Sequence, residues 1–441
     1  MRTRFIQAAA VAWLVAALWL PAPAQIIHVD HGPNAPEQQK KHYVILVSLD
    51  GFRYDYAKKY GATNLLRLAA EGASAPEGMI PSFPSVTFPN HYSMITGLYP
   101  EHHGIVANSF YDPARKQTYA ADKVDSVSDG SWYGGEPIWL VAEKLGMRTA
   151  CFFWPTSDAD VEGMHPSYYL HYDRTIPNEQ RIEQVIAWLK LSPEQRPHFL
   201  TLYFADTDHV GHESGPESPQ IAETVRQVDA LMGKLVAELK TLSLPVDLII
   251  VSDHGMATVE GNWIDLDHYT DLSQFVTVGS LLYAPDEEAA ARAYRQLRGA
   301  SDKFVVYRRA NVPAYLHFNA NPRIGDPVVI ATGPYVIRAH ASETPEVVQP
   351  SVKGQHGYDP SKMKSMRAIF YAAGPDISPG VTVSPFENVD VYPLIAKILG
   401  LEVGHVDGQL EPLRPILRET VKGPQPSEPG SHATATASHI N

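Results

Sequence analysis

The chain has 441 residues, of which 44% are hydrophobic and 19% are charged, a balance typical of globular proteins rather than disordered or fibrous ones. Its formal net charge of −13 argues against a surface that coats nucleic acid or binds an anionic membrane. The single cysteine, Cys151, excludes an intramolecular disulfide and cysteine-ligated metal clusters, and its apolar surroundings predict an inert buried thiol.

The first 24 residues have the pattern of a cleaved signal peptide. Two arginines precede an apolar stretch from Ala8 to Leu20, and small residues follow at Ala22 to Ala24. About 13 apolar residues are fewer than the ~20 that a membrane-spanning helix needs, so we expect a periplasmic or secreted protein without a membrane anchor. Residues 25–41 are predicted to form a linker, and residues 422–441, which lack periodic apolar positions, a disordered tail.

Between these ends, strand patterns alternate with helical ones. Continuous apolar runs are typical of strands in a parallel sheet that is covered on both faces. Such runs occupy Tyr43–Leu49, Arg148–Phe153, Phe199–Ala205, Val246–Ser252 and Met366–Ala372. Helical periodicity predicts helices at Glu179–Leu191, Ser218–Leu242, Asp286–Leu297 and Asn388–Leu399. The alternation predicts an α/β fold, a doubly wound, mostly parallel sheet sandwiched by helices.

Two segments fit this alternation poorly. Residues from about 109 to 145 and from about 257 to 350 are predicted to be insertions that cap the site. In doubly wound folds, ligands bind beyond the carboxyl ends of the strands. Asp50 ends the first predicted strand, Asp208 follows the third, and Asp253 with His254 ends the fourth, so we expect a functional site at that edge.

Further candidate metal ligands lie close to these strand ends. Asp208 and His212 are four residues apart, which would place both side chains on one side of a helix, although DTDHVGHESG is equally typical of a polar turn. Asp206 and His209 are alternatives in the same segment. His356 lies in a glycine-containing loop that could bring its imidazole to a metal. Because divalent ions such as Zn²⁺ take carboxylates and imidazoles, the set predicts a two-metal centre for phosphoryl transfer.

Thr87 is the candidate nucleophile. The segment PSVTFPNHYSMITG predicts a loop that turns into a helix, with Thr87 at or next to the N-cap, Pro89 in the first turn and Gly97 at the end. There the hydroxyl would face the positive end of the helix dipole, where a phosphoryl group is also favoured. A threonine hydroxyl bound to a divalent ion can lose its proton and attack phosphorus, whereas without a metal Thr87 would be a plain capping residue.

Four other residues are candidates for substrate contacts. The side-chain amide of Asn108 could donate a hydrogen bond to a phosphoryl oxygen as charge develops, although a loop asparagine is more often a turn former. Tyr168, Tyr172 and Tyr203 lie close to the motifs, and Tyr203 could offer its ring face to a nucleobase. Simple packing is the competing interpretation for all three tyrosines.

The motifs SLDGFR, TFPNHYSMITGLYPEHHGI, DxxxGH, SDHGM and GQHGY, in this order, resemble those of the nucleotide pyrophosphatase/phosphodiesterase family of the alkaline phosphatase superfamily. The resemblance covers most of residues 42–415, which we expect to form the catalytic domain. It implies that one Zn²⁺ is bound by Asp50, Thr87, Asp253 and His254, and a second by Asp208, His212 and His356. It also implies that Thr87 forms a phosphothreonine intermediate, that Asn108 holds the phosphoryl oxygen, and that a nucleoside 5'-monophosphate is released.

The chain departs from the family pattern in two ways. Many members carry a lysine just before the nucleophile, where this chain has Val86. The cysteine-rich and nuclease-like domains of larger members are not recognised, so the resemblance is to the short, single-domain bacterial type. The substrate of the larger members therefore cannot be assumed.

Other functions use nearly the same residues. Diesters of choline, glycerol or lipid head groups are alternative substrates, and phosphate mutases and phosphonate hydrolases share most of the ligands. A phosphate monoesterase usually holds the terminal phosphate with an arginine or a third metal, and the Thr87 and Asn108 segments contain no arginine. The non-enzymatic alternative is a secreted binding protein that retains metals, which the complete ligand set argues against. The expected partner is a small nucleotide or other phosphodiester, and the oligomeric state is not predicted.

Overall fold

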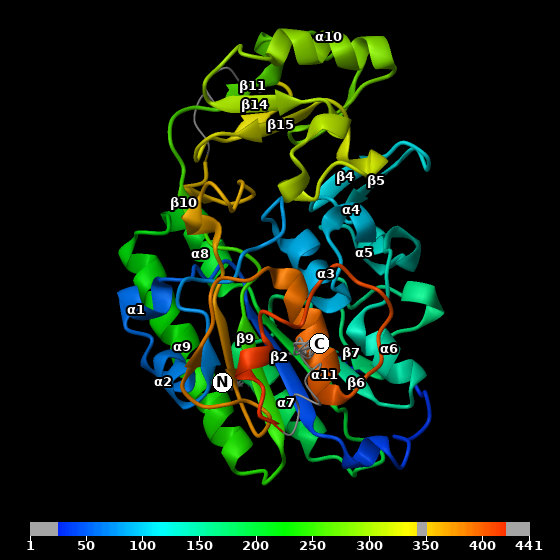
Figure 1. Cartoon of the computed structure of the whole chain (residues 1–441), viewed down its shortest axis with the longest axis vertical. Coiled ribbons are helices and arrows are strands. Elements are labelled where there is room, and N and C mark those ends of the chain that lie inside the picture. Colours follow the sequence, from blue (N-terminus) through cyan, green and yellow to red (C-terminus); the bar gives the residue numbers. More distant parts are fainter. Residues whose placement is uncertain (1–24, 342–350, 420–441) are drawn as a thin grey trace, which may run out of the picture.

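The computed structural model describes residues 25–341 and 351–419 and contains a nine-stranded mixed sheet (Figure 1). In spatial order, its strands are β1 (Ile27–His28), β7 (Tyr168–Tyr169), β6 (Thr149–Phe152), β8 (Phe199–Phe204), β2 (Tyr43–Leu49), β9 (Val246–Val251), β18 (Phe370–Ala373), β3 (Ala73–Ser74) and β19 (Val381–Thr382). The centre, from β7 to β9, is parallel throughout, which confirms the predicted fold class.

The fifth predicted strand, Met366–Ala372, differs from expectation. It begins only at Phe370 and runs antiparallel to β9. A buried apolar run shows that a strand is covered on both faces, but it carries no information about the direction of the neighbouring strand.

Helices cover both faces of the sheet because the side chains of a strand point alternately to opposite sides. All seven residues of β2 are buried. Val44 and Leu46 pack with α3, α6 and α11, whereas Ile45 and Val47 pack with α1, α2, α7 and α9. The helix bounds are α1 (Tyr56–Tyr60), α2 (Thr63–Glu71), α3 (Thr87–Thr96), α4 (Pro100–His103), α5 (Val124–Ser128), α6 (Ile138–Lys144), α7 (Asn178–Leu189), α8 (Asp206–Ser214), α9 (Pro219–Lys240), α10 (Glu287–Leu297) and α11 (Val391–Leu399).

The predicted helix starts agree with the capping contacts. The Ser218 side chain accepts a hydrogen bond from the backbone N–H of Ile221, and Pro219 is the first residue of α9. The Asp286 side chain accepts the N–H of Ala289 at the start of α10 in the same way. Such caps satisfy backbone donors that have no partner inside the helix.

The two predicted insertions differ in character. The first contains the hairpin of β4 (Ser109–Asp112) and β5 (Gln117–Ala120), followed by α5, but its last part is α6, a buried helix of the main body. In the second, the described residues 257–341 form a lobe at the top of Figure 1; part of it has its own apolar core, while Val312, Leu316, Phe318 and Ile324 pack into the core of the main body. Its strands are β10 (Ala257–Thr258), β11 (Ile264–Asp265), β12 (Val276–Val278), β13 (Leu281–Tyr283), β14 (Phe304–Tyr307), β15 (Val328–Ala331) and β16 (Ile337–Arg338).

The lobe joins the main body where β10 pairs with β17 (Gly354–Gln355). Its segments 278–281 and 328–331 line a cavity of about 370 Å³ together with Val86, Asn108 and His356. The second insertion therefore forms one wall of a cavity next to the candidate site.

The segment 25–41 packs against the sheet edge instead of running as a free linker. Its strand β1 pairs with β7, the ring of His28 stacks on Tyr168, and the His31 ring bonds the carbonyl of His165. The predicted signal peptide and the predicted tail 422–441 lie outside the described residues.

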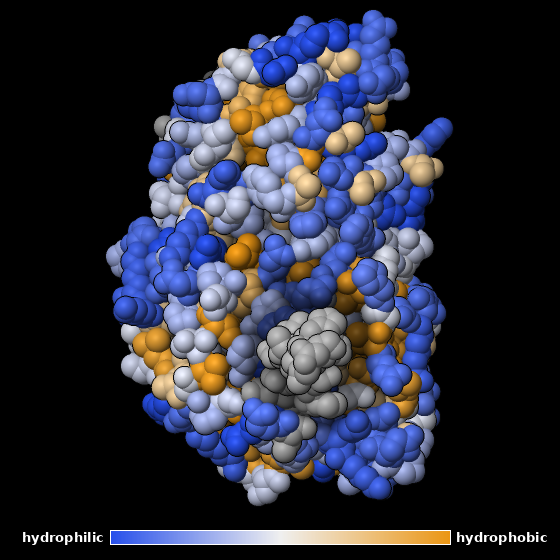
Figure 2. Space-filling view, viewed as in Figure 1, coloured by the Kyte–Doolittle hydropathy of each residue, from blue (hydrophilic) through white to orange (hydrophobic). Residues whose placement is uncertain are grey.

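The face of the molecule in Figure 2 is mainly hydrophilic, as the composition of a globular protein predicts, and its hydrophobic residues form separate patches. Cys151 is fully buried, as predicted. Among the described residues, no helix combines the length and apolarity needed to cross a membrane.

Candidate two-metal active site

Three carboxylates meet at the carboxyl edge of the parallel sheet. Asp50 directly follows β2, Asp253 follows the neighbouring β9, and Asp208 lies in the first turn of α8, after β8. Gly51 makes this approach possible, because its φ is +65° and a Cβ at this position would lie 2.8 Å from the Cα of Asp208. Asp50 and Asp253 are 1% and 0% exposed, so both carboxylates are out of contact with water.

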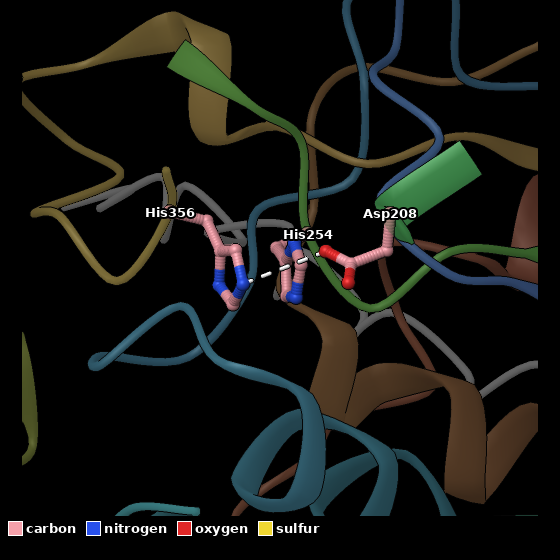
Figure 3. A group of neighbouring side chains, drawn as sticks. All are labelled: Asp208, His254 and His356. Carbon is pink, nitrogen blue, oxygen red and sulfur yellow. Dashed lines mark ion pairs between the residues drawn. The ribbon is translucent and has the colours of Figure 1, made fainter. Parts of the chain in front are cut away.

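Three histidines direct Nε2 into the same space. Each ring is held by a contact from Nδ1 to a backbone carbonyl, at 2.8–2.9 Å: His212 to Gly354, His254 to Gly255, and His356 to Ser85. A hydrogen bond at Nδ1 fixes the ring and leaves the Nε2 lone pair available, as in most metal-binding histidines. His254 Nε2 lies 3.0 Å from Asp253 Oδ2, and His356 Nε2 lies 3.5 Å from Asp208 Oδ1 (Figure 3).

The residues fit two neighbouring divalent cations. Among the described residues, Asp50 Oδ1, Asp208 Oδ1 and Asp253 Oδ2 are buried oxygens without a hydrogen-bond partner, an arrangement that is costly unless a cation is present. One group of donor atoms within 4.8 Å of one another comprises Asp50, Asp253 and His254, and another comprises Asp208, His254 and His356. His212 joins the second group, with Nε2 3.4 Å from Asp208 Oδ1.

His254 lies between the two groups. Its ring stacks on that of His356 with 3.6 Å between the ring centroids, and Figure 3 shows Asp208 beside both rings. The two donor groups correspond to the two ligand sets implied by the family resemblance, apart from this shared histidine.

The electrostatics of the centre reflect its crowded carboxylates. Burial, together with the neighbouring Asp253 and Asp208, raises the pKa of Asp50 well above its usual value. Burial and the adjacent His254 lower the pKa of His356 to about 3, so this imidazole is neutral near pH 7 and able to bind a metal. Burial alone would raise the pKa of Asp208 and Asp253, but the histidines beside them lower the pKa of each, so these two carboxylates are charged near pH 7.

Thr87 faces this centre from the start of α3. It is the first residue of the helix, directly after the N-cap Val86, and its hydroxyl lies 3.5 Å from His254 Nε2. Its predicted position next to the N-cap is confirmed, as is the helix end at Gly97, which has a left-handed φ of 68°. The N-cap Val86 has no side chain that could cap the helix, and the Thr87 hydroxyl contacts His254 of the centre.

His91, one helical turn after Thr87, was not recognised from the sequence. Its Nδ1 lies 2.9 Å from the carbonyl of Thr87 and 3.5 Å from Asp253 Oδ2, and its Nε2 lies 2.8 Å from Ser48 Oγ. The i, i+4 spacing from Thr87 is the signal that could have identified it. His91 thus ties the start of α3 to β2 and Asp253.

The residues predicted to contact substrate have different positions. Asn108 Oδ1 accepts the backbone N–H of Phe88 at 2.9 Å, which orients the amide next to Thr87 and leaves its Nδ2 as a donor. Tyr203 reaches the centre through its hydroxyl, which donates to Asp50 Oδ2 at 2.5 Å. Tyr172 is half exposed and its ring is 6.1 Å from that of Tyr203.

Tyr168 is not brought to the site. Its hydroxyl donates to the carbonyl of Gln195, and its ring stacks on His28 at the edge of the sheet. The alternative ligands Asp206 and His209 are also turned elsewhere, since Asp206 accepts from the Asn178 amide and His209 contacts Glu213. The helical arrangement of Asp208 and His212, left open by the sequence, is the one observed.

A cavity of about 320 Å³ opens beside Thr87. Its aromatic wall comprises Phe88, Phe153, Trp154, Tyr172 and Tyr203. The first three were not proposed from the sequence, although Phe88 directly follows Thr87 and Trp154 follows the carboxyl end of β6. These positions place flat apolar surfaces within reach of a group attached to a phosphate at Thr87.

Comparison with known proteins identifies the family. The model of the type I phosphodiesterase / nucleotide pyrophosphatase family matches residues 44–359. The chain belongs to this family. The human ectonucleotide pyrophosphatase/phosphodiesterase family member 1 is 32% identical over 426 residues, covering 92% of this chain and 45% of the human protein.

Other members of the family show the same relationship. An uncharacterised pyrophosphatase/phosphodiesterase of Schizosaccharomyces pombe is 34% identical, over 85% of this chain and 80% of its own length. Venom phosphodiesterase of Naja atra is 32% identical, over 90% of this chain and 49% of its own length. The chain thus spans about half the length of the human and snake relatives.

Solved structures confirm the fold. Murine ectonucleotide pyrophosphatase/phosphodiesterase 5, as an inactive variant in complex with AMP, superposes with a TM-score of 0.80 and 28% identity. The match covers 86% of this chain and the whole of the murine one.

Proposed function

We propose that this chain hydrolyses phosphodiester or pyrophosphate bonds of nucleotides and releases nucleoside 5'-monophosphates. The observation that carries the proposal is the Thr87 hydroxyl, which lies at the positive end of α3 and 3.5 Å from His254 Nε2 in a centre of partnerless carboxylates. Membership of the family and the AMP bound to the murine relative support it.

We propose two Zn²⁺ ions as cofactors. Asp50, Thr87, Asp253 and His254 would hold one, and Asp208, His212 and His356 the other. When bound, the ions supply positive charge that favours deprotonation of a coordinated hydroxyl and offsets the charge of a phosphoryl group.

Thr87 and Asn108 carry the reaction in this proposal. The Thr87 oxygen forms a bond to phosphorus while the bond to the leaving oxygen breaks on the opposite side, giving a phosphothreonine ester. The Asn108 amide donates to a phosphoryl oxygen as negative charge develops. Water then attacks the ester in line, the bond from phosphorus to Thr87 breaks, and the hydroxyl is restored. Two successive displacements retain the configuration at phosphorus.

The aromatic cavity beside Thr87 favours a nucleoside on the retained phosphate. Phe88 and Tyr172 present rings that a base can stack on, because every nucleobase has a planar face. A choline diester is the second candidate, since Asp122 and Asp158 line the same cavity and a quaternary ammonium binds to aromatic rings and acids. Burial raises the pKa of Asp158 and so disfavours its charged form, and its Oδ2 lies 3.0 Å from His171 Nδ1, both of which favour the nucleoside over a cationic group.

A diester is favoured over a monoester by the charges around Thr87. The nearest arginine to Asp50 in sequence, Arg53, pairs with Asp55 and Glu217 and is thus engaged away from the phosphate position. No arginine lines either cavity beside Thr87 in the described part of the chain. The second charge of a monoester would therefore meet no side-chain cation.

The test compares three p-nitrophenyl substrates: the thymidine 5'-monophosphate ester, phosphorylcholine and plain phosphate. We expect the highest kcat/KM for the thymidine diester. Thr87→Ala should abolish turnover while the protein keeps its zinc, and Thr87→Ser, which retains a hydroxyl, should keep part of the activity. A preference for phosphorylcholine or plain phosphate would replace the nucleotide proposal, and normal rates in Thr87→Ala would exclude Thr87 as nucleophile.

We also propose that the protein acts outside the cytoplasm. The support is the signal-peptide pattern of its first 24 residues and the names of its relatives, which include ectoenzymes and venom enzymes. Fractionation of cells that produce the full chain, followed by N-terminal sequencing, tests both export and cleavage near Ala24.

A further inference from the structure

A second cluster of metal-binding side chains lies at the opposite edge of the sheet from the candidate active site. His42 directly precedes β2, Asp247 is the second residue of β9, and Asp376 lies in the turn after β18. Because β2 and β9 are parallel neighbours and β18 runs antiparallel to β9, these three positions meet at the amino-terminal edge of β2 and β9. Six residues of strand separate Asp247 from Asp253, a distance of roughly 20 Å.

The geometry of this cluster is that of a cation site. His42 Nδ1 lies 2.7 Å from Asp376 Oδ2, and one donor atom from each of His42, Asp247 and Asp376 lies within 4.8 Å of the others. Asp247 Oδ1 accepts the backbone N–H of Asp376 at 3.0 Å, which fixes the Asp247 carboxylate. Its second oxygen, Oδ2, is buried and has no hydrogen-bond partner among the described residues.

That partnerless oxygen is unusual in this protein. Buried acids with a structural role are satisfied by donors: Asp229 accepts three N–H groups from Asn64 and Leu65, and Glu143 accepts from Thr149 and Ser167. In the described part of the chain, five buried carboxylate oxygens lack a partner, and three of them belong to the candidate active site. The other two are Asp267 Oδ1 and Asp247 Oδ2, and only Asp247 has a histidine and a second carboxylate of a potential ligand set beside it.

The charges at this edge favour a divalent ion. Asp247 is 0% exposed and Asp376 7%, so two carboxylates face each other with little water to separate them. The guanidinium of Arg418, whose charge acts on Asp247, donates from Nε to the carbonyl of Ile377, and the residue is exposed. Two carboxylates this close and this little exposed repel each other unless a proton or a cation lies between them, and a metal bound to both removes the repulsion.

We propose that His42, Asp247 and Asp376 bind a structural Zn²⁺ ion that joins the ends of three neighbouring strands. An imidazole nitrogen with two carboxylate oxygens is a zinc-type ligand set, and a water molecule can complete it from the side of His42, whose side chain is 38% exposed. The ion would link the start of β2 to β9 and to the chain after β18, far from the reacting phosphate.

The test measures how many zinc ions each full chain binds. The protein is loaded with excess Zn²⁺, unbound metal is removed, and the zinc content is determined by inductively coupled plasma mass spectrometry. Asp247→Asn preserves the size of the side chain and its oxygen acceptor for Asp376, so the variant should fold. We expect it to hold one zinc per chain fewer than the wild type, and His42→Ala to lose the same equivalent. Asp271→Asn, an exposed acid-to-amide change elsewhere, should lose none.

The opposite result has its own signature. If Asp247 and Asp376 share a proton instead of a metal, Asp247→Asn will keep the wild-type zinc content and unfold at a higher temperature, because the amide is uncharged without taking up a proton on folding. That result overturns the proposal, as does the absence of an anomalous zinc peak between the three side chains in crystals of the wild type. Zinc binding at the candidate active site is tested separately by the zinc content of His212→Ala. The proposal for the His42 cluster and the proposal for the active site can therefore fail independently of each other.

Discussion

Replacing Tyr203 by phenylalanine should weaken metal binding at the candidate active site without disturbing the aromatic cavity. The Tyr203 hydroxyl donates to Asp50 Oδ2 at 2.5 Å, and both residues are buried. Burial and the Asp50 carboxylate raise the pKa of Tyr203 well above its usual value, so the hydroxyl stays protonated and donates throughout the range in which the protein is folded. Phenylalanine keeps the ring and removes only this bond.

The magnitude follows from the charge of the acceptor. A hydrogen bond to a buried charged group contributes about 1.5–3 kcal/mol, and about 1.4 kcal/mol corresponds to a factor of ten. We therefore expect a loss of zinc affinity of about 10- to 100-fold at the position held by Asp50, in line with other changes that remove a hydrogen bond to a metal ligand.

Competition with a chromophoric chelator measures the affinity of both ions in Tyr203→Phe and in the wild type. One affinity should fall, and kcat/KM should recover when zinc is added in excess. Unchanged zinc affinity would refute the reasoning. A raised KM at saturating zinc would instead assign the Tyr203 hydroxyl to substrate binding.

Three further changes have defined outcomes. Asn108→Ala should slow hydrolysis of the thymidine diester by roughly 10² or more with zinc content unchanged, and a smaller effect would exclude its role as an oxyanion donor. Tyr172→Ala should raise KM for the thymidine diester by about 5- to 100-fold, as expected for a lost stacking contact, but not for methyl p-nitrophenyl phosphate, which has no base. Burial raises the pKa of Asp390 to about 6, so its ionisation lowers the stability of the fold as pH rises from about 4 to about 6. Asp390→Asn should thus be more stable than the wild type by about 1–3 kcal/mol at pH 7, with a smaller gain at pH 5; an equal gain at both values in denaturant unfolding would contradict this assignment.

The sequence predicted the central sheet because burial on both faces demands apolar residues at most positions of β2, β8 and β9, with only Ser48, Thr201 and Asp247 as polar exceptions. It could not predict the direction of β18, since an apolar run looks the same in either direction. The seven candidate metal ligands could be recognised in the sequence because they follow strands or lie in short motifs. The fold brings these seven residues together.

Contacts between segments that are far apart in the chain could not be predicted from the sequence. The bond from Tyr203 to Asp50 depends on the register of β2 and β8, and the aromatic wall of the cavity combines side chains from four separate parts of the chain. His42, Asp247 and Asp376 share no motif, and only the antiparallel β18 brings Asp376 back to the other two. The segment 25–41 carries so few apolar residues that its pairing with the sheet edge leaves no pattern.

The pairing of β10 with β17 holds the two ends of the second insertion together beside the catalytic residues. The chain leaves the metal centre after His254, and it returns there at His356, with Thr258 directly opposite Gly354 in the ladder. A short turn that connects Thr258 to Gly354 would therefore close a two-strand hairpin while both histidines keep their backbone positions. The lobe thus starts on a two-strand stem, but Val312, Leu316 and Phe318 pack into the core of the main body, so a replacement would have to cover that core as well as rebuild the wall of the cavity beside His356.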